Sequence, residues 1–108
     1  MIARIWEGKV LRTKRNEFLR YIKQTGLPGL KKTKGNLAVQ IMVRDTNTFS
    51  HFMILSLWDS VDSIKNFTGP DYKKARLYPM DIKFLHGMKP IFHYEVLVNE
   101  NPNYPIRN

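Results

Sequence analysis

The chain has 108 residues, no cysteine and a formal net charge of +9, which together predict a single domain without disulfides, zinc–thiolate sites or cysteine nucleophiles. No apolar run approaches the roughly 20 residues that would cross a bilayer, and the N-terminus meets charge too early for a secretory signal. We therefore expect a cytoplasmic protein that has no membrane partner.

The first third of the chain predicts a strand followed by a helix. Residues 2–10 form a predicted strand that places Arg4 and Trp6 on the same face, since side chains alternate along a strand. The hydroxyl of Thr13 is a suitable N-cap for a helix that ends near Thr25. The sequence Gly-Leu-Pro-Gly-Leu that follows predicts a turn.

The middle of the chain predicts a β-hairpin whose strands are apolar on both faces. The strands cover 37–44 and 50–58, and the polar segment 45–48 joins them. In the second strand both alternating sets of side chains are apolar, with Phe52, Ile54 and Trp58 on one face and Met53, Leu55 and Leu57 on the other. So short a chain has too little helix to cover both faces of a sheet, so the second face needs a partner or a ligand. We expect a homodimer.

The second half of the chain predicts a helix, a second helical segment, a loop and a last strand. Asp59 or Ser60 caps the first helix, and Gly69 breaks it. The later elements are a helical segment over 71–77, a loop over 80–90 and a strand over 91–98.

This order of elements predicts an α+β, ferredoxin-like βαββαβ fold with a four-stranded antiparallel sheet and both helices on one face. Residues 1–98 make the domain, and residues 99–108 are a predicted tail, loosely held, that contains two prolines. Two such sheets stacked face to face would cover each other's bare faces.

Positive charge is concentrated early in the chain. Nine lysines and arginines lie between residues 9 and 34, where Glu17 is the only acid. RNA-binding sheets usually interleave exposed aromatic and basic residues on their strands, whereas the central strands here are aliphatic. We therefore interpret the basic residues as a solvated surface and expect no nucleic-acid partner.

Five short segments resemble the antibiotic biosynthesis monooxygenase-like family of the dimeric α/β-barrel superfamily, namely 1–6, 56–60, 64–67, 75–79 and 93–96. The resemblance covers residues 1–98. It implies a homodimer of facing sheets with a pocket between each sheet and its own helices. Characterised members oxidise aromatic polyketides or quinols without metal or flavin, or bind and degrade haem.

The resemblance to the haem-degrading members is incomplete. Their asparagine, tryptophan and histidine ligand correspond here to Glu7, Phe67 and Leu77. Leu77 cannot ligate iron, and the guanidinium of neighbouring Arg76 stays protonated. We therefore expect no cofactor, although haem binding through other groups such as His86 or His93 stays open. The three histidines of the chain form no metal-ligating cluster, which predicts no metal site.

Aromatic and basic residues around the predicted pocket are the candidate site residues. A flat aromatic ligand would bind Arg4 and a set of aromatic walls made by Trp6, Trp58, Phe67, Tyr78 and Phe84. The catalytic candidates are Arg76, His93 and Tyr72: the resemblance implies deprotonation of a phenol, for which arginines stabilise the anion while His93 or a tyrosine moves the proton. Ordinary core packing is the alternative role, above all for Trp58 and Phe67.

The resemblance, together with these residues, thus implies a cofactor-independent monooxygenase acting on a small aromatic or quinone-type compound. The alternative is a non-catalytic dimeric α/β-barrel protein that binds a small ligand or haem.

Overall fold

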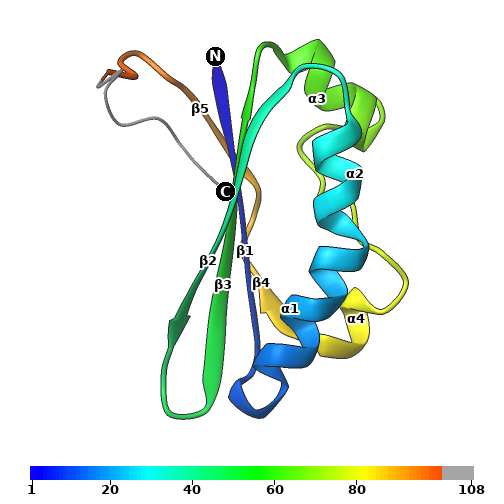
Figure 1. Cartoon of the computed structure of the whole chain (residues 1–108), viewed down its shortest axis with the longest axis vertical. Helices are drawn as coiled ribbons and strands as arrows, with labels where there is room; N and C mark the ends of the chain where they lie inside the picture. The colour runs from blue at the N-terminus through cyan, green and yellow to red at the C-terminus, as the bar shows by residue number, and fades with distance from the viewer. Residues whose placement is uncertain (101–108) are drawn as a thin grey trace.

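The computed structural model describes residues 1–100 and shows an antiparallel sheet with the helices of this region gathered on one side of it (Figure 1). The predicted tail, apart from residues 99 and 100, lies outside the described residues. In chain order the elements are β1 (Ile2–Leu11), the 3₁₀ helix η1 (Arg12–Lys14), α1 (Arg15–Gln24), α2 (Gly26–Lys32), β2 (Asn36–Asp45), β3 (Phe49–Trp58), α3 (Val61–Thr68), α4 (Asp81–Phe84), β4 (Leu85–Met88) and β5 (Phe92–Glu95). Within residues 1–100, no helix has the length and apolar character needed to span a membrane.

The sheet confirms the predicted ferredoxin-like order. Its strands lie in the order β2-β3-β1-β4, and β5 pairs with β1 as well. β5 lies opposite Ile2–Ile5 and β4 lies opposite Gly8–Val10, so both occupy the same edge of β1. The four predicted strands therefore correspond to four strand positions in the sheet, and the fourth position is divided between β4 and β5. Pro90 lies in the gap and has no N–H to donate to the ladder.

The first helical region differs from the prediction. Thr13 lies inside η1 and is no N-cap; α1 begins at Arg15 without a side-chain cap. The predicted turn after Thr25 is instead the helix α2. Pro28 is tolerated there because it lies in the first turn, where its missing N–H has no helical partner to lose.

The connection after β3 begins as predicted and then departs from the prediction. The hydroxyl of Ser60 accepts the N–H of Ser63 at 3.2 Å, and α3 ends before Gly69, whose φ is +87°. The predicted helical segment over 71–77 is a single turn followed by irregular chain. Its backbone carbonyls are used by another partner, Arg4, instead of by helical N–H groups.

The predicted loop over 80–90 is also wrong, because it contains the short helix α4 and the strand β4. The predicted last strand over 91–98 is regular only across β5.

The core lies between the sheet and the helices. It consists of two clusters, one of Leu30, Val39, Trp58, Ile64 and Phe67, and one of Val10, Phe18, Ile22 and Phe52. The alternation predicted in β3 is confirmed, since Phe52 and Trp58 are buried under the helices while Met53 and Leu55 remain partly exposed. No helix of the described region covers the opposite face of the sheet (Figure 1).

Gly29 allows the loop before α4 to approach α2 closely. A Cβ atom at this position would collide with the hydroxyl of Tyr78, whereas the next nearest atoms, on the rings of Phe67 and Tyr78, lie at 3.4 and 3.5 Å. The phenol of Tyr78 can therefore occupy its position only because residue 29 has no side chain.

We expect Gly29→Ala to lower the free energy of unfolding by about 1–3 kcal/mol, because overpacking outweighs the helix preference of alanine, worth up to ~1 kcal/mol. Urea unfolding measures the difference. Gly29→Ala in a Tyr78→Phe background lacks the colliding hydroxyl and should lose much less. An equal loss in both backgrounds would contradict this packing.

Candidate functional site

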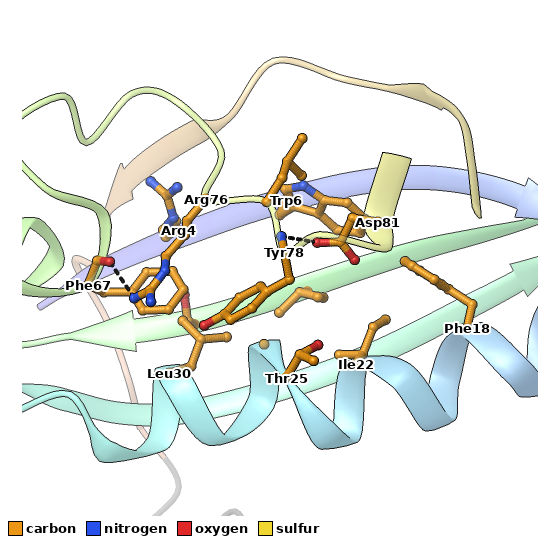
Figure 2. Close-up of a pocket in the computed structure, with 14 residues that line it drawn as sticks. Arg4, Trp6, Phe18, Ile22, Thr25, Leu30, Phe67, Arg76, Tyr78 and Asp81 are labelled. Carbon is orange, nitrogen blue, oxygen red and sulfur yellow. Dashed lines mark hydrogen bonds between the residues drawn. The ribbon is translucent and has the colours of Figure 1, made fainter. Parts of the chain in front are cut away.

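A cavity lies between the sheet and the helices, where the resemblance implies a pocket (Figure 2). The space open to the centres of water molecules is about 60 Å³. One water needs roughly 10–15 Å³ by this measure, so the cavity has room for roughly four to six waters. Their volume in the liquid is close to that of a cavity that binds benzene, about 150 Å³. The cavity is therefore the size of one aromatic ring.

Apolar side chains from five elements form most of the cavity wall. Trp6 comes from β1, Ile54 from β3 and Phe67 from α3, while α1 and α2 contribute Phe18, Ile22 and Leu30. Such walls favour a flat apolar body, and the few polar groups among them determine its orientation.

Arg4 carries a buried positive charge to this wall from the centre of the sheet. Its side chain is only 4% exposed, and it donates to the backbone oxygens of Tyr72 and Lys74, the latter at 2.9 Å. Within residues 1–100 no carboxylate lies within 4.0 Å of it. Burial lowers the pKa of Arg4 to about 10, so it stays a cation at neutral pH.

His93 lies directly opposite Arg4 on the neighbouring strand β5. Its Nε2 is 2.9 Å from Nη1 of Arg4 and must accept, because a guanidinium can only donate. Burial, followed by the charges of Arg4 and Lys73, lowers the pKa of His93 to about 4. A ring with this pKa is neutral at pH 7 and a weak base, so His93 is poorly suited to take a proton from substrate.

Arg76 lies on the exposed side of the cavity, in the irregular chain after α3. Its Nη1 donates to the backbone oxygen of Phe67 at 2.9 Å. The guanidinium carbon is 4.9 Å from the ring centroid of Phe67 and 5.1 Å from that of Tyr78. Two cation–π contacts thus hold its position (Figure 2).

Asp81 is a cavity residue that the sequence analysis missed. It begins α4, is 8% exposed, and its Oδ2 accepts the N–H of Tyr78 at 2.7 Å (Figure 2). Burial raises the pKa of Asp81, and the hydrogen bond from Tyr78 opposes part of that rise. The available signal was an acid two residues after a proline, typical of a helix start, but a loop was predicted there.

The structure brings five of the nine candidate residues to the cavity wall: Arg4, Trp6, Phe67, Arg76 and Tyr78. The other four lie outside the wall. Tyr72 and His93 contact Arg4 but do not line the cavity, and the centroids of their rings lie 5.0 Å apart. Trp58 is fully buried and donates to the hydroxyl of Ser56, and Phe84 packs against Phe18. For Trp58 and Phe84, core packing accounts for the position.

The burial of His93, together with the nearby charges of Arg4 and Lys73, makes stability depend on pH. Unfolded histidine has a pKa of about 6.5, so below that pH the unfolded chain binds a proton that the folded chain rejects until about pH 4. We expect the urea midpoint to fall between pH 6.5 and pH 4, and to fall less in His93→Gln. His86→Gln, an exposed histidine, is the control. An unchanged pH dependence in His93→Gln would contradict this assignment.

No model of a protein family matches the chain, and no curated protein matches it. Solved structures do match it. A protein from Bacillus cereus, provisionally named an antibiotic biosynthesis monooxygenase, superimposes with a TM-score of 0.66 and 12% identity over 93% of this chain and 96% of its own. A Deinococcus radiodurans protein with the same provisional name gives a TM-score of 0.65 and 18% identity over 94% and 97%.

The haem degrader MhuD from Mycobacterium tuberculosis, solved with two haems in its active site, gives a TM-score of 0.65 and 15% identity over 94% of this chain and 100% of its own. Identities this low show a shared fold and do not carry an activity from one chain to another. The resemblance inferred from the sequence is thus confirmed for the fold: this chain has the ferredoxin-like fold of structures named antibiotic biosynthesis monooxygenases.

Proposed function

We propose that this chain is a cofactor-independent monooxygenase for a small hydroquinone-type aromatic compound. The observation that carries the proposal is the ring-sized apolar cavity with two arginines and a buried carboxyl group in its wall. Aromatic walls orient a ring, cations favour its anion, and a carboxyl with a raised pKa can take the proton.

The electron balance narrows the substrate. A simple phenol needs two electrons from an outside reductant to accept one oxygen atom from O₂. A hydroquinone supplies all electrons itself: hydroquinone plus O₂ gives hydroxyquinone plus water, with one oxygen atom entering the ring and the other leaving as water. A compound with two ring hydroxyls therefore fits a site that works without a redox cofactor.

Three residues have direct roles in this proposal. The carboxylate of Asp81 accepts a hydroxyl proton, which forms the electron-rich anion that reacts with O₂. Arg4 stabilises that anion from a buried position, and Arg76 adds a fixed positive charge at the exposed side of the cavity. His93 and Tyr72 act through Arg4 as positioning residues, a revision of the catalytic roles predicted from the sequence.

Haem is the other ligand that the fold suggests, since MhuD binds it. Leu77 lines the cavity at the position where the resemblance implies the histidine ligand, and no histidine, cysteine or methionine of the described region lines it. Tyr78 does line the cavity, but its hydroxyl packs against Gly29 of α2. The donor set thus favours a small aromatic compound over haem.

We also propose that two copies of this chain pair through the bare face of the sheet. Met53 and Leu55 lie on that face, and Phe92 and Tyr94 of β5 are 49% and 58% exposed. Contiguous apolar surface of this kind marks an interaction site in a protein that stays in solution. A second copy offers an identical apolar face, which a closed two-fold interface requires.

Oxygen uptake with hydroquinone tests the proposed activity. We expect Asp81→Asn to lower kcat by about 100-fold or more, because general-base catalysis contributes that much, and the wild-type rate to rise with pH through the pKa of Asp81. Asp71→Asn makes the same change on an exposed loop and should leave the rate unchanged. Uptake no faster than without protein would leave a non-catalytic binding protein.

Sedimentation of the variant Leu55→Glu tests the pairing. A carboxylate in the centre of an apolar interface is left unpaired, so we expect the dimer to give way to a monomer at micromolar concentration. Ile82→Glu changes an apolar residue that is 73% exposed on α4, on the helical side, and should remain dimeric. A monomeric wild type would refute the pairing.

A further inference from the structure

Most hydrogen-bond donors of Arg76 are not used by the described residues. A guanidinium carries five N–H donors, and within the described residues Arg76 uses Nη1 alone, on the oxygen of Phe67. No carboxylate in residues 1–100 lies within 4.0 Å of it. Arg4 differs, because both of its terminal nitrogens are engaged by the chain itself. Arg76 is thus the cavity arginine whose planar fork can receive an anion.

The position of Arg76 is set before any ligand arrives. The rings of Phe67 and Tyr78 lie within about 5 Å of the guanidinium, and the backbone oxygen of Phe67 anchors one end of it. A charge that is already oriented loses little conformational entropy when it binds. Because Arg76 both lines the cavity and is exposed, an anion on Arg76 would lie between the cavity and solvent.

The charges around the cavity are unbalanced toward the positive. Arg4 and Arg76 line it, and the single acid in its wall among the described residues is Asp81, whose pKa is raised. The pKa of His93 is lowered first by burial and then by the charges of Arg4 and Lys73, so the smaller part of this shift reflects the same positive surroundings. An anionic ligand would compensate a charge that the protein leaves uncompensated.

We propose that the substrate is a single-ring hydroquinone that bears a carboxylate, with its ring in the cavity beside Trp6 and its carboxylate paired with the fork of Arg76. This inference rests on the proposed function and narrows its substrate class. It makes Arg76 the residue that selects acids over neutral rings of the same size, because a planar guanidinium and a carboxylate can form two parallel hydrogen bonds.

Calorimetric binding of two probes tests the inference separately from any turnover. The probes are 2,5-dihydroxybenzoate and 2,5-dihydroxybenzamide, which have nearly the same shape and differ in charge. We expect the wild-type protein to bind the acid about 10-fold or more tightly than the amide, since a charged pair adds about that much. In Arg76→Gln the ratio should fall below ~2-fold, and Arg76→Lys should keep part of it.

Lys83→Gln is the matched control, because it removes an equal charge from neighbouring α4 and should leave the ratio unchanged. Equal binding of both probes by the wild type, or a preference that survives Arg76→Gln, would overturn the role of Arg76. In that case oxygen uptake with hydroquinone would still support the proposed function. Binding of neither probe would remove the aromatic site itself, and the proposed function with it.

Discussion

The buried guanidinium of Arg4 organises this domain around its cavity. It projects from β1, the strand that pairs with β3, β4 and β5, and it holds the irregular chain after α3 through the carbonyls of Tyr72 and Lys74. The same group contacts His93 on β5. Because a buried charge without partners costs several kcal/mol, Arg4 needs these contacts, which hold the chain that leads to Arg76 and Tyr78.

The choice of partners for Arg4 determines the chemistry of the cavity. Carbonyl oxygens and a neutral imidazole satisfy its donors but carry no negative charge, so the positive charge remains for a ligand. A carboxylate in the same place would have cancelled it. The raised pKa of Asp81 and the lowered pKa of His93 are both consequences of burial at this site, and they separate a better base from a poorer one.

Sequence patterns predicted correctly those features that depend on interactions between residues close together in the chain. The alternation in β3 predicted both faces of the sheet, and the pair Asp59 and Ser60 predicted the start of α3, where the structure selects Ser60 as the cap. Strand faces and N-caps depend on neighbours in sequence. The helical segment over 71–77 was wrong because its carbonyls bond to Arg4, some 70 residues away in the chain. α2 was missed because a Gly-Leu-Pro-Gly sequence reads as a turn, and the need of Tyr78 for Gly29 cannot be read locally.

The sequence by itself determined the ferredoxin-like order of elements, the two-sided apolar sheet and a set of arginines and aromatic residues suited to a planar ligand. Only the tertiary structure decided which of these residues share a wall. It placed Arg76 and Asp81 at the cavity. It also placed Trp58 in the core, Phe84 against the core and His93 in contact with Arg4 outside the cavity wall. The reason is that β5 and the chain after α3 are positioned by contacts with β1, and these long-range contacts leave no period or spacing in the sequence.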